Sequence, residues 1–536
     1  MWKDVEEEEG GGRSTGDSLP QEGSVFRRIR TMSMAFEVRG EADGRLLSTV
    51  HPRDWKNPTP LDRYDLVVIG AGTGGLVSAA IGAALGARVA LVERDLMGGD
   101  CLNHGCVPSK AVLRASRSWA EARASADRFG GPAAAGRGSF AGAMERMREI
   151  RADISAADGA QRFSDLGVHV FFGEARFDGP DSVRVGKDRL PFRRAILATG
   201  ARASIPPIPG LSDTSILTNE NVFGLIELPE RLLVLGAGPV GCELAQAFNR
   251  FGSRITLLDV AERPLPREEA RASAVLLSAL EGEGVTFLGG ARILEVAESA
   301  GGRSVTFEKD GTVRTVEGDS LLLALGRAPN VELGLEAAGV SYDRQGVEVD
   351  DRLRTTNRRI FAVGDVASSF QFTHVADAQA RIAVRNALFF GRGKSSSLVI
   401  PAATYTSPEV ARVGPTSSDL QASGIDVETL EVSLSEVDRA RLDGDEEGFV
   451  QVHLRRGKDE ILGATIVAPH AGDLIVQVTQ AMKLGIGLLA LGDVVFPYPT
   501  TAEALRKAAD KHRRKSLTPR IRSFFETYFR LSRLLP

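Results

Sequence analysis

The stretch YDLVVIGAGTGG, residues 64–75, joins an apolar run to a cluster of glycines. The apolar run over 64–69 predicts a buried strand, and we expect a helix over about 76–85 behind the glycines. Three glycines have the spacing of a nucleotide-binding turn: Gly70, Gly72 and Gly75. The first allows a tight turn, the second lets the backbone approach a pyrophosphate, and the third permits close packing of the helix. The stretch therefore predicts a strand–turn–helix unit with a phosphate site at the helix N-terminus.

The same unit occurs a second time along the chain. An apolar run over 232–235 leads into another glycine cluster, and a helix is expected from about 242 to 251. The glycines of this second turn are Gly236, Gly238 and Gly241. The repeat predicts a second dinucleotide site, unless one copy is degenerate and empty.

In each copy a second strand follows the helix and ends at an acid. The strands are expected over 88–92 and 255–258, and the acids are Glu93 and Asp259. Each acid lies 23 residues after the first glycine of its copy. A carboxylate at this place accepts hydrogen bonds from an adenosine ribose, so both copies carry the complete pattern.

Two cysteines lie close together in GGDCLNHGCVPSK, residues 98–110. The chain has only three cysteines in 536 residues, which excludes a disulfide scaffold. Cys101 and Cys106 are five residues apart, and a pair this close can form a strained, reducible bridge. The alternative is two buried, inert cysteines that pack as small hydrophobic residues.

Composition limits the classes of protein that the chain can belong to. The apolar content of 43% and charged content of 25% are those of a soluble globular protein, and the length predicts several domains. The net charge of −4 gives no overall attraction to nucleic acid, so no nucleic-acid partner is expected. Residues 66–87 carry no charge and are long enough to span a bilayer, but their glycines and alanines favour a buried strand, turn and helix.

Neither end of the chain shows a clear targeting signal. No apolar signal-peptide core stands near the N-terminus, so we expect a cytoplasmic protein, or an organellar one if the N-terminal segment is a targeting sequence. The tail over 511–536 has eight Lys or Arg against one Glu. One helical face of the tail is apolar: Ile521, Phe524, Phe525, Tyr528 and Phe529. Such a face could touch an anionic membrane, but we expect it to dock on its own protein.

Four further motifs stand in a characteristic order. They are Ala198–Gly200, Gly326–Asn330, Ile360–Asp365 and Thr404–Glu409. The candidate cofactor-binding residues within them are Thr199, Gly200, Gly326, Arg327, Gly364 and Asp365. Together with the two glycine turns and the cysteine pair, these motifs resemble those of the class I flavin-dependent pyridine nucleotide–disulfide oxidoreductases, over about 64 to 505. The resemblance implies an α/β fold with two doubly wound nucleotide-binding domains and an α/β dimerisation domain.

The resemblance also implies domain boundaries. The FAD domain would comprise 61–222 and 333–397, the NAD(P) domain 223–332, and the dimerisation domain 398–510. A largely disordered extension over 1–60 would precede them, and a basic extension over 511–536 would follow.

By the same resemblance, the first glycine turn holds FAD and the second holds NAD(P)H. Cys106 would be the flavin-side thiol and Cys101 the thiol that meets the substrate. Lys110 matches the lysine near the flavin N5, and Glu243 matches its ion-pair partner. The alternative for this pair is an ordinary surface contact. His374 lies in a segment that lines the flavin.

The sequence departs from the family where a general base is expected. Members with thiol substrates carry HPTxxE, whereas this chain has Tyr498 in place of the histidine and keeps Glu503. A phenol with a pKa near ~10 is a poor base at neutral pH. Because Tyr498 and Glu503 would complete the partner subunit's site, a homodimer is expected. A tyrosine here resembles the mercuric reductases, but their C-terminal cysteine pair is missing, and the third cysteine, Cys242, is expected to be structural.

The electron acceptor and the coenzyme therefore stay open. The acceptor could be a soft metal ion such as Hg(II), held transiently by Cys101 and Cys106, or a quinone or small disulfide. A disulfide reductase that uses His104 as base, and a redox sensor with low turnover, are the alternatives. Asp259 favours NADH, although Arg254 and Arg263 nearby could accept the 2′-phosphate of NADPH.

Overall fold

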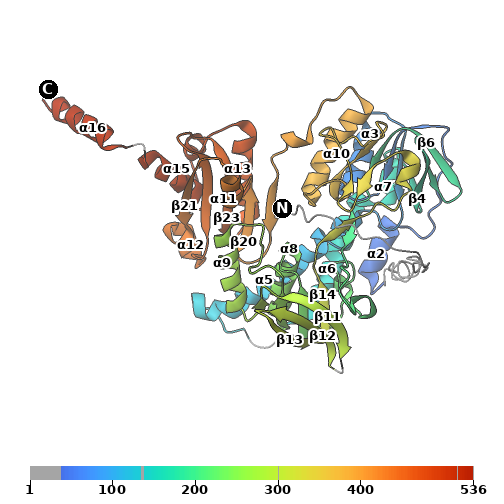
Figure 1. Cartoon of the computed structure of the whole chain (residues 1–536), viewed down its shortest axis with the longest axis horizontal. Helices are drawn as coiled ribbons and strands as arrows, with labels where there is room; N and C mark the ends of the chain where they lie inside the picture. Colours follow the sequence, from blue (N-terminus) through green and yellow to red (C-terminus); the bar gives the residue numbers. More distant parts are fainter. Residues whose placement is uncertain (1–37, 135–137, 300, 516, 535–536) are drawn as a thin grey trace, which may run out of the picture.

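The computed structural model describes residues 38–134, 138–299, 301–515 and 517–534. Within these ranges the chain forms three α/β units, each with its own sheet (Figure 1). The first unit carries the first glycine turn, the second unit carries the second, and the third unit follows residue 400. The expected α/β class is confirmed.

The first unit has a seven-stranded sheet in the order β3-β2-β1-β6-β5-β4, with β18 also paired to β6. Its strands are β1 (Tyr64–Ile69), β2 (Val89–Glu93), β3 (His169–Phe172), β4 (Ala175–Gly179), β5 (Ser182–Val185), β6 (Asp188–Leu197) and β18 (Ile360–Ala362). β1, β2, β3, β6 and β18 are parallel, whereas β4 and β5 form an antiparallel extension. The sheet thus combines two pieces of chain that the second unit separates.

Helix α3 (Thr73–Ala84) follows β1 and packs against α10 (Thr373–Leu388). The helix begins three residues earlier than the sequence predicts, because Gly72 is its N-cap and Gly75 lies inside its first turn. A side chain on Gly75 would place its Cβ 1.7 Å from the carbonyl oxygen of Gly70, so only glycine permits this approach. The uncharged stretch 66–87 is therefore a strand, a turn and a helix, and none of the helices in the described ranges is long and apolar enough to cross a membrane.

The second unit repeats the plan with a four-stranded parallel sheet in the order β10-β9-β8-β14. Its strands are β8 (Arg231–Leu235), β9 (Arg254–Leu258), β10 (Thr286–Leu288) and β14 (Ser320–Leu323). Helices α8 (Pro239–Phe251) and α9 (Ala270–Gly282) belong to it, and β11 (Arg292–Ser299), β12 (Gly302–Lys309) and β13 (Thr312–Gly318) form a separate antiparallel sheet.

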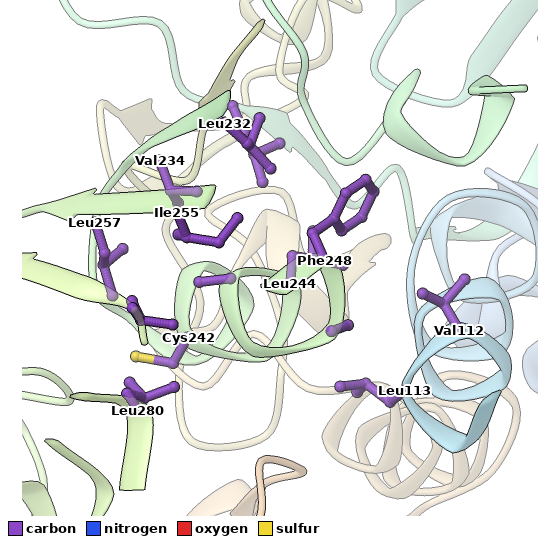
Figure 2. Packing of buried hydrophobic residues seen from close by; sticks show 14 of the residues in the cluster. Val112, Leu113, Leu232, Val234, Cys242, Leu244, Phe248, Ile255, Leu257 and Leu280 are labelled. Carbon is purple, nitrogen blue, oxygen red and sulfur yellow. The ribbon is translucent and has the colours of Figure 1, made fainter. Parts of the chain in front are cut away.

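A single apolar core joins the first two units. Figure 2 shows Leu244 and Phe248 of α8 between the strands of the second unit and Val112 of α5 (Cys106–Phe129). Helix α5 begins at a cysteine of the redox motif, so its packing on α8 brings that motif to the second nucleotide unit.

The third unit is a five-stranded antiparallel sheet in the order β19-β20-β23-β22-β21, flanked by helices. Its elements are β19 (Pro401–Thr404), β20 (Glu409–Val413), β21 (Val427–Ser433), β22 (Phe449–Arg455), β23 (Ile461–Ala468), α11 (Ser417–Ala422), α12 (Asp438–Asp443), α13 (Ala471–Leu484), α14 (Leu488–Gly492) and α15 (Glu503–Lys515).

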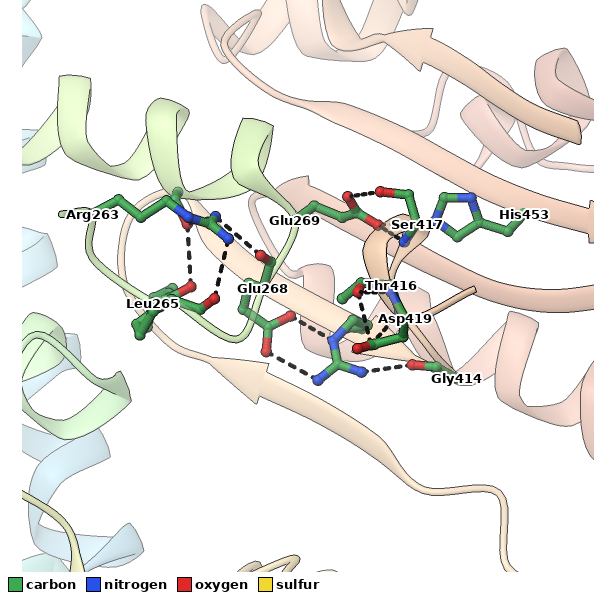
Figure 3. Close-up of polar contacts among 12 residues, drawn as sticks. Arg263, Leu265, Glu268, Glu269, Gly414, Thr416, Ser417, Asp419 and His453 are labelled. Atoms are coloured by element: carbon green, nitrogen blue, oxygen red, sulfur yellow. Dashed lines mark hydrogen bonds and ion pairs between the residues drawn. The ribbon is translucent and has the colours of Figure 1, made fainter. Parts of the chain in front are cut away.

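A polar network fastens the second unit to the third (Figure 3). Glu268 accepts from Arg412 at 2.7 Å, and Glu269 accepts from the amide of Ser417 at 2.6 Å and lies 3.1 Å from Nε2 of His453. Burial alone would raise the pKa of Glu269, but hydrogen bonds from His453 and Ser417 outweigh it and lower the pKa to about 2. The carboxylate therefore stays charged at neutral pH and holds both units together.

In the described part of the N-terminal stretch, residues 38–60, the structure differs from the expected disorder. Helix α2 (Glu41–Val50) lies in this stretch and packs on α6 (Phe140–Ser155) through buried Leu46 and Val50. Its Asp43 is buried and accepts from Arg151 of α6 at 2.8 Å. Residues 1–37 lie outside the described residues.

Two features of the tail also differ from expectation. Residues 511–515 continue α15, so the body extends five residues beyond the predicted boundary, and Lys511 donates to Glu436 at 2.9 Å. Helix α16 (Pro519–Ser532) has no buried residue and projects away from the third unit (Figure 1). The apolar face therefore does not dock on its own chain, and docking on the partner subunit stays a prediction.

Candidate active site

The redox motif forms a short helix, a break and a long helix. Cys101 lies in α4 (Gly99–Asn103), and Cys106 is the first residue of α5, with Gly105 as its N-cap. A Cβ on Gly105 would lie 2.8 Å from a carboxylate oxygen of Asp100, and one on Gly99 would lie 2.6 Å from Cα of Gly72. These glycines let the motif fold back on itself and pack directly against the first nucleotide turn.

Cys106 has the environment of a thiolate. No side chain caps the N-terminus of the 24-residue helix α5, where the helix dipole favours negative charge. The hydrogen bond with Cys101 lowers the pKa of Cys106 most, burial opposes it, and Thr373 and Lys110 lower it further, to about 6. The Sγ atom lies 3.2 Å from Oγ1 of Thr373. At neutral pH this cysteine is therefore mainly ionised.

Cys101 is the complementary partner. Its hydrogen bond to Cys106 and its burial both raise its pKa, so it keeps its proton. Both cysteines are free thiols here, and Cys106 is the more exposed of the two. An ionised thiol beside a protonated one is the reduced form of an asymmetric redox pair.

His104 lies between the two cysteines. Burial lowers the pKa of His104, with Asp100 and Glu220 acting in the opposite direction. Its imidazole is therefore neutral at neutral pH. A role for His104 as base stays a prediction.

Lys110 reaches a buried carboxylate of the second unit. Its Nζ donates to Oε2 of Glu243 at 2.8 Å, and the Glu243 side chain is only 5% exposed. The other oxygen of Glu243 accepts from the amide of Tyr405 at 2.8 Å, and Lys110 Nζ lies 4.6 Å from the centre of the Tyr405 ring. The pair is thus a junction between all three units, and it is not an exposed surface contact.

Arg327 links the redox motif to the second FAD-type motif. It lies 3.3 Å from Asp100 and 3.3 Å from Asp365, and it donates to the carbonyl of Ala201 at 2.7 Å. Burial raises the pKa of Asp365, and Arg327 opposes this. Arg327 lies in β15 (Arg327–Pro329), which pairs with β7 (Ala201–Ala203) where the chain passes between the first and second units.

The remaining predicted residues of these motifs lie beside this connection. Thr199 Oγ1 donates to the carbonyl of Asn330 at 2.8 Å, and the amide of Asn330 donates to the carbonyl of Gly200 at 2.9 Å. Gly326 accepts from the amide of Ser204 at 3.0 Å. The amide of Gly364 donates to Gln379 of α10 at 2.8 Å. The structure thus brings these sequence-distant motifs into one region.

Both nucleotide turns present the same geometry. Gly72 and Gly238 are helix N-caps without a side-chain cap, so the N–H groups of the first turn stay open to an anion, except at Pro239, which has none. Glu93 accepts from the amides of Ala71 at 2.7 Å and Asp95 at 2.9 Å. These acids and open helix ends fit the ribose and pyrophosphate of a dinucleotide.

Asp259 repeats the arrangement of Glu93. It accepts from the amides of Ala237 at 2.5 Å and Ala261 at 2.8 Å. Of the two nearby arginines, Arg254 pairs with Glu230 at 3.0 Å. Arg263 donates to Ser273 at 2.7 Å and to the carbonyls of Glu268 and Pro266 at 3.1 Å each (Figure 3).

Tyr498 and Glu503 are not hydrogen-bonded to each other. The Tyr498 hydroxyl donates to Asp438 at 3.2 Å, and this contact raises the pKa of the phenol. Glu503 is buried and pairs with Arg506, and within the described ranges its Oε2 has no hydrogen-bond partner. In one chain these residues have no described hydrogen bond to the cysteine pair.

Sequence reasoning missed three residues of this site. Thr373 contacts Cys106, Tyr405 lies over Lys110, and Asp100 contacts Arg327. Each lies within or beside a motif that indicated another residue as functional. For Thr373, the only local signal was a hydroxyl at the start of a predicted helix. Within the described ranges, no group of three or more His, Cys, Asp or Glu could hold a resident metal ion.

The comparisons with known proteins agree with this geometry. Residues 64–380 match the family "pyridine nucleotide-disulphide oxidoreductase", and residues 400–509 match its dimerisation domain. The mercuric reductase of Bacillus cereus is 34% identical over 447 residues, which cover 83% of this chain and 71% of the relative. The dihydrolipoyl dehydrogenase of Bacillus subtilis is 32% identical over 463 residues, covering 83% of this chain and 97% of the relative.

A solved structure is also similar. The Cu(II) complex of the HOCl-induced flavoprotein disulfide reductase RclA from Escherichia coli superposes with a TM-score of 0.75 at 27% identity. The match covers 84% of this chain and 99% of that chain. The chain therefore belongs to the pyridine nucleotide–disulfide oxidoreductases, a family of FAD-dependent enzymes with NAD(P)H as electron donor, and its dimerisation domain indicates a homodimer.

Proposed function

We propose that this enzyme reduces soft metal ions, such as Hg(II) or Cu(II), through the Cys101–Cys106 pair. The observation that carries the proposal is a thiol pair with an ionised, exposed Cys106 in a chain that has Tyr498 where a histidine base would stand. Soft metal ions bind thiolates and displace the proton of a neighbouring thiol, so the pair needs no general base to hold them. Mercuric reductases among the relatives and the Cu(II) complex of RclA support the same choice.

The residues that would hold the cofactors follow from the site. The N-terminus of α3 and Glu93 would bind the pyrophosphate and ribose of FAD, Asp365 its ribityl chain, and Lys110 would lie near the flavin ring. When bound, FAD would accept a hydride from the nicotinamide and supply two electrons to the oxidised Cys101–Cys106 disulfide, which would become two thiols. Cys106, as the ionised thiol, would be the flavin-side sulfur, and Cys101 would be the sulfur that meets the acceptor.

NADH is the donor that the second nucleotide turn favours. The charge of Asp259 repels a 2′-phosphate, whereas the carboxylate can accept from a 2′-hydroxyl. The two cations that could offset this repulsion, Arg254 and Arg263, are engaged with Glu230 and with the 266–273 segment. We therefore expect kcat/KM for NADH to exceed that for NADPH at least about tenfold, which corresponds to a difference of about 1.4 kcal/mol in transition-state stabilisation.

An acceptor panel tests the proposal. The holoenzyme is mixed anaerobically with NADH and with Hg(II), Cu(II), a quinone, oxidised glutathione or lipoamide, and oxidation of NADH is followed. We expect turnover with the metal ions at one NADH for each Hg(II) or for two Cu(II), and loss of turnover in Cys106→Ser. Cys242→Ser is the matched control, because Cys242 is buried in α8.

Other results would point to the alternatives. Rapid reduction of glutathione or lipoamide without metal turnover would make the enzyme a disulfide reductase, the activity that the dihydrolipoyl dehydrogenase relative would suggest. Negligible turnover with every acceptor, despite bound FAD, would favour a redox sensor.

A further inference from the structure

Helix α16 presents a broad apolar face that nothing in the described chain covers. The exposed fractions of its large apolar side chains range from 39% to 66%. These residues are Ile521, Phe524, Phe525, Tyr528, Phe529 and Leu531. Three ring contacts join the aromatic residues to each other along the helix. The polar contacts described for α16 also stay within the tail, as in the pair Arg522–Glu526 at 3.3 Å.

Basic side chains border this face. At about 100° per residue the apolar side chains fall on one arc, with Arg520 next to one edge and Arg522 next to the other. Arg530 lies on the opposite side, the C-cap Arg533 lies on the same side as Arg522, and Glu526 is the single acid of the helix. An aromatic face with flanking arginines is the pattern of a helix that lies in the plane of a membrane interface.

The helix needs a surface to be stable. An isolated helix of fewer than about 12–15 residues is marginal in water, and α16 has 14 residues without a tertiary contact that buries it. A length of about 21 Å would let it lie flat on a bilayer with its rings at the headgroup level.

Charge favours anionic lipid as that surface. The segment over 517–536, which follows α15, carries a net +3 from four Arg and one Glu, so the rest of the chain carries −4 − 3 = −7. The acidic body gains nothing from an anionic surface, and attraction must come from the tail. The match to the dimerisation domain ends at residue 509, so α16 lies beyond the matched domain.

We propose that α16 is an interfacial anchor that binds the enzyme to anionic membrane surfaces, with Phe524, Phe525 and Phe529 inserted among the headgroups. The homodimer would present two such helices, and the second would bind with a raised effective concentration. Neither helix would span the bilayer.

Vesicle binding tests the proposal without any need for turnover, so it is independent of the acceptor. The full-length holoenzyme is sedimented with vesicles of phosphatidylcholine and phosphatidylglycerol (7:3) or of phosphatidylcholine alone. We expect binding to the anionic vesicles only, and weakening as salt is raised. Arg520→Gln/Arg522→Gln should lower the partition coefficient about 25-fold, since each basic side chain near an anionic surface contributes a factor of about five.

The apolar contribution needs a matched control. The triple variant Phe524→Ser/Phe525→Ser/Phe529→Ser should abolish binding to the vesicles. The double variant Phe389→Ser/Phe390→Ser removes two exposed phenylalanines that directly follow α10 in the chain, and it should leave binding unchanged. Bound FAD and an unchanged elution volume verify that each variant folds and assembles.

Two results would overturn the proposal. The first is an absence of binding to anionic vesicles at low salt. The second is docking on a second copy of the chain: slow amide exchange of 519–532 in the lipid-free dimer, together with dissociation of the dimer when α16 is removed.

Discussion

The hydroxyl of Thr373 lies 3.2 Å from the Sγ of Cys106, although 267 residues separate them in the sequence. Thr373 is the first residue of α10, and Cys106 is the first residue of α5, so two helix N-termini meet at this sulfur. Both helix dipoles and the hydroxyl favour negative charge on the same atom. The ionisation of Cys106 is thus a property of the assembled fold.

Thr373→Val should raise the pKa of the Cys106 thiol. A hydrogen bond to a charged group contributes about 1.5–3 kcal/mol, so its loss should shift the pKa upward by one to two units. In the reduced wild-type enzyme, the long-wavelength thiolate–flavin absorbance should be present above pH 6 and fade as pH falls through about 6. Its midpoint in the variant should lie near pH 7 or above. Thr479→Val in α13 is the control, and an unshifted midpoint in Thr373→Val would contradict the assignment.

The two cysteines should differ in their single variants. Cys106→Ser should remove the thiolate–flavin absorbance and the turnover, because the ionised sulfur is lost. Cys101→Ala should keep the absorbance, since Cys106 remains, but with a higher midpoint because the hydrogen bond from Cys101 contributes most to the low pKa and alanine has no donor. Absorbance titrations of both proteins decide this, and a retained band in Cys106→Ser would reverse the two roles.

Tyr498→His should increase reduction of small disulfides. Proton transfer by a positioned side chain contributes about 10²–10⁴-fold, so an increase of at least tenfold is expected if the missing base limits the rate. Tyr498→Phe serves as the control, because it removes only the hydroxyl that contacts Asp438. Steady-state rates with oxidised glutathione and lipoamide measure the effect, and equal rates in both variants would argue against a missing base.

Asp43→Ala should destabilise the protein strongly. Asp43 and Arg151 are both buried, and Arg151 also donates to the carbonyl of Asn103 in the redox helix α4 at 2.9 Å. Removal of one member of a buried ion pair costs about 3–5 kcal/mol. Asp153→Ala is the matched control, because its pair with Arg45 joins the same two helices at the surface and is worth less than about 1 kcal/mol.

Thermal unfolding of the FAD-bound dimers measures this difference. If the midpoint of thermal unfolding of Asp43→Ala were as high as that of Asp153→Ala, the buried contact between α2 and α6 would not stabilise the protein.

The glycine turns illustrate what a local pattern can predict. The period of apolar residues, the three glycines and the acid 23 residues on predicted two strand–turn–helix–strand units, and both are present. Each of these depends on short-range periodicity and turn chemistry, which a sequence displays directly.

The failures share a physical reason. Nothing near Asp43 indicates that Arg151, 108 residues away, will bury it, so the N-terminal segment could pass for an unstructured extension. For α16, an apolar helical face predicts burial but does not say against what, and its own chain leaves it exposed.

By itself, the sequence determined the two nucleotide units, the position of the redox cysteines and the missing histidine, because each depends on residues that are close together in the sequence. Only the tertiary structure decided which cysteine is ionised, that Glu243 is buried beneath Lys110, and that Arg263 is engaged away from Asp259. These properties depend on burial and on distances between segments far apart in the chain, and folding alone sets both.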